Sequence, residues 1–293
     1  MDKEVKKQLQ DEKIQNKQNL EGYIPSPKDD RDYTISTVGL TVSELPSEYR
    51  TEGEVKILSQ GSVGSCVAHA IATAMAYREL KAGKSTYNNY SRGFIYGNRR
   101  DTDYSKEGMI TRQALRQVNH DGDCLYNTFP WNEKYPLVKD RIAKGKDIYF
   151  NESKNYKIKS YFRCHTDEEI KTAIMTQGAV VLGMPLYKGF GKNVPLPTIN
   201  DEMTGGHAMC CVGWNKDGWI VQNSWGSRWG DNGYCYIPYE YPVSEWWGIT
   251  MDDNIPELKK DNWFVKALKF TWFYICFAGK WLKSMFSKKD NNS

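Results

Sequence analysis

The sequence lacks the features that mark several common classes of protein. Its first 23 residues, MDKEVKKQLQDEKIQNKQNLEGY, contain no apolar run of the kind that forms the core of a secretory signal. It has no CxxC pair and no cluster of histidines at the spacing of zinc ligands, and it has only four histidines in all. We therefore expect a protein made in the cytoplasm that uses no metal and no other cofactor.

The cysteines and the charges exclude two further classes. The chain has seven cysteines, an odd number, and 293 residues are enough to bury a core, so we expect reduced thiols rather than a disulfide framework. The net charge is +4, but residues 257 to 293 hold eight lysines against three acidic residues, which leaves the rest of the chain near neutrality. A main body without a basic surface argues against nucleic acid as a partner.

The distribution of polar, apolar and charged residues along the chain predicts three parts. Residues 1 to 44 read as a polar N-terminal arm and a linker rich in proline and aspartate, which could include a short pro-segment. Residues 45 to 256 form the compact part, helical over about 45 to 155 and rich in strands over about 156 to 256. Residues 257 to 293 form a basic tail. Helices followed by strands predict an α+β fold in two lobes with a cleft between them.

Apolar periodicity places the main elements. The stretch CVAHAIATAMAYRELK, residues 66 to 81, has alanines and large apolar residues all around, which predicts a buried central helix. Further helices are expected over residues 111 to 119 and 167 to 177. The short apolar runs GAVVLGM, HAMCCVGW, WIVQNSW and YCYIPY then predict antiparallel strands in a small barrel or a strongly twisted sheet.

The stretch QGSVGSC places a cysteine where a helix begins. Cys66 would be the first residue of the central helix, where the positive end of the helix dipole favours thiolate over thiol. Gln60, six residues earlier, could return its side-chain amide toward a developing oxyanion, with the backbone N–H of Cys66 as the second donor. This pattern predicts a nucleophile, and His69, one turn further along the helix, is the rival candidate for its base.

A second pair of motifs supplies a base from another part of the chain. GGHA contains His207, and NSWGSRWGDNGY begins at Asn223, sixteen residues later. Two strands joined by the turn NKDG would bring these side chains together, so that Asn223 fixes the imidazole while its other nitrogen faces Cys66. Trp225 would lie over this hydrogen bond and shield it from water.

These three motifs together resemble the papain family of cysteine peptidases. The resemblance implies a papain-like two-lobe fold, with Cys66 as nucleophile, His207 as base, Asn223 as the orienting residue, Gln60 at the oxyanion and Trp225 as the shield. It extends more weakly over residues 45 to 251, and GYIPSPKDDRDY and YIPYEY look closest to bacterial and bacteriophage members. The chain departs from many relatives at Val63, where they have a disulfide cysteine, and at Val67 and Met109.

The resemblance also implies where a peptide or protein substrate would bind. EGMITRQAL is similar to the strand that pairs with the substrate backbone, and GAVVLGM is similar to the strand that lines the S2 pocket. The expected substrate-binding residues are Gly64, Ser65, Gly108, Met109, Ala179, Gly206 and Ala208. Because the first 44 residues are much shorter than the long inhibitory propeptides of lysosomal members, we do not expect control by such a prodomain.

The tail carries a separate signal. As a helix, residues 262 to 286 would place Lys266, Lys269, Lys280 and Lys283 in one stripe against a wide aromatic face. A membrane surface, a protein partner and a second copy of the chain all fit this pattern. A spanning helix fits less well, since the apolar run from residue 270 to residue 279 is only ten residues long. A cytoplasmic protein, peripheral to a membrane or associated with a larger particle, is expected.

Three functions remain open from the sequence. The first is a thiol endopeptidase that forms an acyl-thioester on Cys66. The second is a structural or assembly protein, for example in a virion, that keeps the peptidase fold. The third is a transpeptidase or ligase that passes the same acyl group to an amine.

Overall fold

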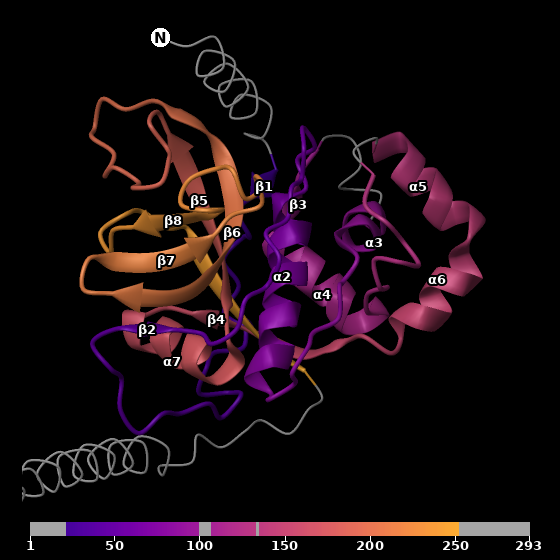
Figure 1. Cartoon of the computed structure of the whole chain (residues 1–293), viewed down its shortest axis with the longest axis horizontal. Coiled ribbons are helices and arrows are strands. Elements are labelled where there is room, and N and C mark those ends of the chain that lie inside the picture. The colour runs from indigo at the N-terminus through magenta and orange to yellow at the C-terminus, as the bar shows by residue number, and fades with distance from the viewer. Residues whose placement is uncertain (1–21, 100–106, 133–134, 252–293) are drawn as a thin grey trace, which may run out of the picture. The chain divides into compact units, whose positions relative to one another are not determined.

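The computed structural model describes residues 22 to 99, 107 to 132 and 135 to 251 of the chain (Figure 1). The arm over residues 1 to 21 and the amphipathic tail predicted for residues 262 to 286 lie outside the described residues. The chain divides by its contacts into two units, residues 1 to 255 and residues 256 to 293. Within the described residues, no helix is long and apolar enough to span a membrane.

The helices gather mostly in the first half of the chain. Helix α2 (Cys66–Lys81) is buried along almost its whole length, as its alanine-rich sequence predicts. Helices α4 (Thr111–Asp121) and α7 (Asp167–Gln177) also form where the sequence predicts them, and α7 begins with a full capping box of Thr166 and Glu169. The remaining helices are α3 (Arg92–Gly97), α5 (Tyr135–Lys144) and α6 (Lys146–Ser153).

The second half of the chain supplies all but one strand of a seven-stranded antiparallel sheet. Its strand order is β4-β9-β5-β6-β7-β8, and β2 pairs with β6. The bounds are β2 (Tyr49–Arg50), β4 (Ile158–Cys164), β5 (Val180–Tyr187), β6 (Met203–Asn215), β7 (Gly218–Gln222), β8 (Tyr234–Ile237) and β9 (Glu245–Met251). The four apolar runs of the sequence thus supply β5 to β8, and the turn NKDG joins β6 to β7, as predicted.

The sheet is buried on both faces, because helices pack on each of them. Along β6, Ala208, Cys210 and Val212 face the cluster that contains α2, whereas Met209 and Cys211 face the cluster that contains α7. This alternation follows from the pleat of a strand, which sends successive side chains to opposite faces. In Figure 1, α2 lies between the sheet and helices α3 to α6, so the first residue of α2 lies where the helices meet the sheet.

Part of the N-terminal region that the sequence assigns to a polar arm and a linker packs on the folded body. From Gly22 onward it packs on the body: Tyr23, Ile35 and Leu40 are all buried. Strand β1 (Tyr23–Ile24) pairs in parallel with β3 (Met109–Ile110), and the bridge between Thr34 and Arg163 adds a second contact with the body. Apolar side chains spaced through a polar sequence fix this segment, and their burial could not be seen in its composition.

Candidate active site

Cys66 is the first residue of α2, as the loop before it predicts. The backbone groups of Ala208, Val67 and Cys66 itself hydrogen-bond the thiol and favour its ionised form. Burial outweighs them, because the side chain has no exposed surface, and it raises the pKa of Cys66 to about 12. In this closed arrangement the sulfur therefore carries its proton.

His207 and Asn223 lie together beside the thiol. Nε2 of His207 lies 2.8 Å from Oδ1 of Asn223, which makes Nε2 the donor. The next residue of β6, Ala208, contacts Cys66 through its backbone, so this part of β6 lies next to the thiol. Nδ1 of His207 has no hydrogen-bond partner in the described part of the chain, and burial lowers the pKa of His207 to about 4. A neutral imidazole with Nδ1 free is ready to accept a proton.

Aromatic rings enclose this pair. The ring of Trp225 lies 4.7 Å from that of His207, between centroids, and is only 4% exposed. Phe190, from the loop after β5, packs against Trp225 at 5.6 Å, and Trp229 packs against Trp225 at 5.1 Å. The rings keep water from the hydrogen bond between His207 and Asn223, which strengthens it.

Gln60 is held from both ends of its amide. Its Oε1 accepts a hydrogen bond from Oγ of Ser224 at 2.6 Å, and its Nε2 donates to the Val63 carbonyl at 2.9 Å. The backbone N–H of Gln60 also donates to the Ser224 carbonyl at 2.9 Å. Because a primary amide has two N–H groups, one donor of Gln60 remains for another acceptor.

His69, the rival base, takes a structural position. Its Nδ1 lies 3.0 Å from the Ser65 carbonyl, and its ring packs edge-on against Trp131 at 4.8 Å. The side chain is fully buried, and burial lowers the pKa of His69 to about 3. Nδ1 therefore donates a hydrogen bond to the Ser65 carbonyl, which holds the ring against its own helix.

Comparison with known proteins agrees with this geometry. Residues 46 to 252 match the model of the papain family cysteine protease. The chain belongs to the papain family. It is therefore a cysteine peptidase, and the α+β fold with a helical and a sheet-rich part is that of this family.

Individual relatives cover most of this papain-family chain. An uncharacterized peptidase C1-like protein of Acanthamoeba polyphaga mimivirus is 31% identical over 257 residues, which cover 76% of this chain and 83% of that protein. Xylellain, a cysteine protease from Xylella fastidiosa, has a similar structure with a TM-score of 0.70, 27% identity, and coverage of 80% of this chain and 97% of xylellain. Procathepsin B from Trypanosoma congolense shares the fold, with a TM-score of 0.66 at 17% identity, over 82% of this chain and 89% of its own.

Three of the seven substrate-binding residues expected for a papain-family member lie against the N-terminal segment. Met109 donates its backbone N–H to the Gly22 carbonyl at 3.1 Å. A Cβ on Gly206 would lie 2.7 Å from the Tyr23 carbonyl oxygen, and a Cβ on Gly64 would lie 3.2 Å from Cα of Gly22. These contacts place Gly64, Met109 and Gly206 along one path that runs past Cys66, and that path is occupied by residues 22 to 24.

The other four expected residues lie in different settings. Ser65 is the buried N-cap of α2, and the Gly108 carbonyl accepts a hydrogen bond from Arg99. Ala208 is buried beside the thiol, opposite Gly183 in the sheet register. Ala179 is buried in the apolar cluster that contains both Tyr23 and α2, and a Cβ on Gly183 would lie 2.2 Å from the Tyr23 ring.

Several residues at the site are not found by the sequence motifs. Gly22 and Tyr23 cover the thiol, Glu245 lies beside the Tyr23 hydroxyl, and Phe190 covers Trp225. The one available signal was the run GYIP, in which apolar residues interrupt a polar stretch. Among the described residues, no group of three or more His, Cys, Asp and Glu side chains is placed to hold a metal ion.

Proposed function

We propose that this papain-family peptidase is an endopeptidase that hydrolyses peptide bonds through an acyl-thioester on Cys66. The observation that supports the assignment is the pairing of His207 with Asn223 at 2.8 Å beside the residue that starts α2. The pair leaves Nδ1 as the only uncommitted nitrogen of the imidazole. A base held in one tautomer next to a thiol at a helix N-terminus is the arrangement that nucleophilic catalysis requires.

The chemistry follows from these positions. His207 Nδ1 takes the thiol proton, and the Cys66 thiolate attacks the carbonyl carbon of the scissile bond. The oxyanion that forms is stabilised by the backbone N–H of Cys66 and by the second N–H of the Gln60 amide. The leaving amine receives the proton from His207, and the acyl group stays on sulfur.

The second half-reaction uses the same groups. A water molecule gives a proton to His207 Nδ1 and attacks the thioester carbonyl, and collapse of the intermediate returns the proton to the leaving thiolate. Asn223 keeps the imidazole of His207 in place through both half-reactions. Trp225 excludes water from the hydrogen bond between Asn223 and His207. A peptide or protein is the substrate of this cycle.

Replacement of the nucleophile tests the proposal. Cys66→Ala should abolish turnover of a fluorogenic peptide and labelling by the epoxide inhibitor E-64, whereas Cys164→Ala, the loss of another buried cysteine, should leave both intact. Equal turnover in Cys66→Ala and the wild type would refute the assignment. Product masses decide between hydrolysis and transfer: an added amine incorporated into the product indicates a transpeptidase or ligase. A folded chain with no turnover under any condition indicates a structural or assembly role.

The basic tail is assigned a separate role in this proposal. We infer that residues 262 to 286 recruit the protein to another surface, and a membrane is the first candidate. In the expected helix, lysines would face one side and aromatic residues the other. The protein would then be cytoplasmic and peripheral to a membrane or to a larger particle. Deletion of residues 257 to 293 should abolish sedimentation with anionic vesicles and leave peptide turnover unchanged. If vesicle binding persists after the deletion, the residues that bind the membrane lie elsewhere in the chain.

The kinship with bacterial and bacteriophage members also stays a prediction. It rests on the leader GYIPSPKDDRDY and the segment YIPYEY, and the similarity to xylellain supports it.

A further inference from the structure

We propose that Gln222 is a positioning residue of the active site. It holds the helix of the nucleophile and the segment of the oxyanion donor at a fixed place beside the strand that leads to Asn223. The inference rests on the proposed function, because it assigns a further residue to the same catalytic cycle. Gln222 acts through the elements that carry the reacting groups, and its own side chain takes no part in the chemistry.

Gln222 is the last residue of β7 and directly precedes Asn223. In the sheet it lies opposite Cys210 of β6 and Tyr234 of β8. Because successive side chains of a strand point to opposite faces, Gln222 points the same way as Ile220, toward the cluster that contains α2. The residue is 2% exposed. Its amide is therefore buried between the sheet and α2, and its backbone continues into the residue that orients the base.

The oxygen of this amide accepts two hydrogen bonds. Oε1 of Gln222 lies 2.7 Å from the hydroxyl of Tyr77, on α2, and 3.2 Å from the hydroxyl of Tyr234, on β8. Burial raises the pKa of Tyr77 well above the usual range of a tyrosine, so its hydroxyl keeps the proton that it donates. Oε1 thus joins the end of β7 to the helix that begins at Cys66.

The nitrogen of the same amide holds a different segment. Nε2 of Gln222 donates to the carbonyls of Val55 and Lys56, each at 3.3 Å. Four residues further on, that segment reaches Gln60, whose backbone N–H donates to the Ser224 carbonyl at 2.9 Å. A primary amide has two N–H groups and one oxygen with two lone pairs, so these contacts fill every hydrogen-bonding position of Gln222.

One buried side chain thus connects three parts of the active site. They are α2, which begins at Cys66, the segment that ends at Gln60, and the strand that leads to Asn223. A buried polar group that loses its partner is destabilised, so the bonds of Gln222 hold the three parts in one arrangement. Alignment of this kind matters for the rate, because a displacement of about 1 Å in an active site can cost on the order of 10²-fold.

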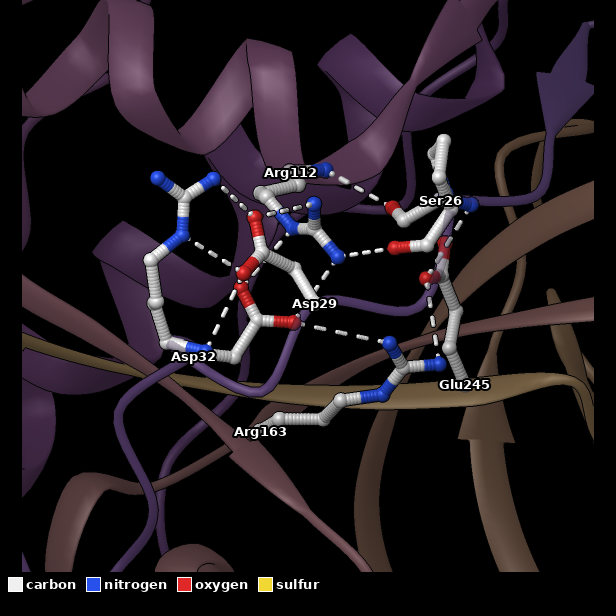
Figure 2. A network of polar contacts seen from close by, with 8 residues as sticks. Ser26, Asp29, Asp32, Arg112, Arg163 and Glu245 are labelled. Carbon is white, nitrogen blue, oxygen red and sulfur yellow. Dashed lines mark hydrogen bonds and ion pairs between the residues drawn. The ribbon is translucent and has the colours of Figure 1, made fainter.

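A charged network elsewhere in the fold gives a contrast (Figure 2). Nε of Arg112, on α4, lies 2.8 Å from Oδ1 of Asp32. Arg163, on β4, lies 3.6 Å from Asp32 and 3.8 Å from Glu245, on β9. These ion pairs fasten the N-terminal segment to the folded body. The bonds of Gln222 join uncharged groups instead, so salt does not screen them, and they connect the elements that carry the residues proposed for catalysis.

Removal of the Gln222 amide tests the assignment. Gln222→Met keeps the length of the side chain and removes its hydrogen bonds to α2, to β8 and to the segment before Gln60. We measure kcat and KM for a fluorogenic peptide. We expect kcat to fall about tenfold or more while KM changes by less than about twofold, because the reacting groups are misaligned and the contacts with the substrate remain.

Gln117→Met is the matched control. Gln117 is 6% exposed, and its Nε2 donates to the Ile95 carbonyl at 2.9 Å, which joins α4 to α3. The control therefore removes a buried glutamine amide that connects two helices and leaves the elements of the proposed active site joined. Urea unfolding should show a loss of stability in both variants. We expect Gln117→Met to keep kcat within about twofold of the wild type, because its amide does not align the reacting groups.

Alkylation of Cys66 gives a second readout that does not depend on turnover. We measure the rate of reaction with iodoacetamide, located by peptide mass, across a range of pH. A thiol beside an imidazole ionises at a lower pH than a thiol that stands apart from one. If Gln222 holds α2 beside the base, the midpoint of the profile should move upward by about half a pH unit or more in Gln222→Met and stay in place in Gln117→Met.

The outcomes separate the role of Gln222 from the peptidase assignment. Equal kcat in Gln222→Met and Gln117→Met overturns the positioning role. A wild-type chain that is alkylated at Cys66 but turns over no peptide refutes the proposed function. In that case a shifted alkylation profile in Gln222→Met alone supports the positioning role, and superimposed profiles overturn it.

A milder variant decides the question if Gln222→Met does not fold. Tyr77→Phe removes a single hydroxyl and leaves the ring in place, so it breaks only the bond between the amide and α2. A lower kcat with unchanged KM in Tyr77→Phe supports the inference, because α2 then depends on this bond for its position. Wild-type kcat and a wild-type alkylation profile in Tyr77→Phe overturn it.

Discussion

His207 and Asn223 are sixteen residues apart in sequence and 2.8 Å apart at Nε2 and Oδ1. The antiparallel register of β6 and β7, in which Cys210 faces Gln222, brings them within reach of each other. The Asn223 N–H donates to the Gly233 carbonyl at 2.9 Å, and the Ser224 N–H donates to Oδ1 of Asn223 at 2.7 Å. The backbone therefore fixes the amide whose Oδ1 accepts the hydrogen bond from Nε2–H of His207.

Removal of the Asn223 side-chain amide should leave a folded enzyme in which the imidazole of His207 is poorly oriented. We expect Asn223→Ala to lower kcat/KM for a fluorogenic peptide on the order of 10²-fold, within the usual contribution of a positioned base. Asn223→Asp keeps an acceptor at Oδ1 and should lose less, while the added negative charge raises the pKa of His207 and shifts the pH profile upward. Wild-type turnover in Asn223→Ala would show that the imidazole needs no such partner.

Acid should destabilise the closed protein through its two buried histidines. Burial lowers the pKa of His207 to about 4 and that of His69 to about 3, against about 6.5 in an unfolded chain. Because the folded pKa is the lower one, stability is complete above pH 6.5 and falls as the pH drops toward the folded values. Each group contributes a slope of about 1.4 kcal/mol per pH unit within that window.

Urea unfolding at a series of pH values checks this dependence. We expect the free energy of unfolding of His69→Gln to fall less steeply between pH 6 and about pH 4 than that of the wild type. In this variant only one of the two buried histidines, His207, still takes up a proton on unfolding. His120→Gln is the matched control, since the side chain of His120 is 80% exposed. Equal slopes in His69→Gln and the wild type would contradict the linkage.

The segment before the family match should contribute to stability. Leu40 is 5% exposed in the cluster that contains α7, although the match begins only at residue 46. Leu40→Ala should lower the free energy of unfolding by about 2 to 5 kcal/mol, as truncation of a buried leucine does. Leu196→Ala, at a leucine that is 48% exposed, should change it by less than about 0.5 kcal/mol. Unfolding by urea gives both values, and equal small effects would show that residues 33 to 44 do not belong to the folded body.

The sequence predicted local elements well where their pattern had one physical solution. An alanine-rich stretch with apolar residues on all sides can be satisfied only by a buried helix, and α2 forms over Cys66–Lys81. The pattern of GAVVLGM was less informative, because Val180, Val181 and Leu182 are all buried and β5 faces a core on both sides. With no polar residue to mark a face, the sequence could not show that a Cβ on Gly183 would meet the Tyr23 ring.

By itself, the sequence determined the types and the spacing of the residues that we propose for catalysis: a cysteine where a helix pattern begins, a glutamine six residues before it, and a histidine and an asparagine sixteen residues apart. These are properties of residue type and spacing, which local structure preserves. Only the tertiary structure decided that Gly22 lies on the Cys66 thiol and that Arg112, Arg163 and Glu245 hold the chain beside it. Contacts between segments 40 to more than 200 residues apart depend on how the helices pack against the sheet, and no local pattern in the chain specifies that packing.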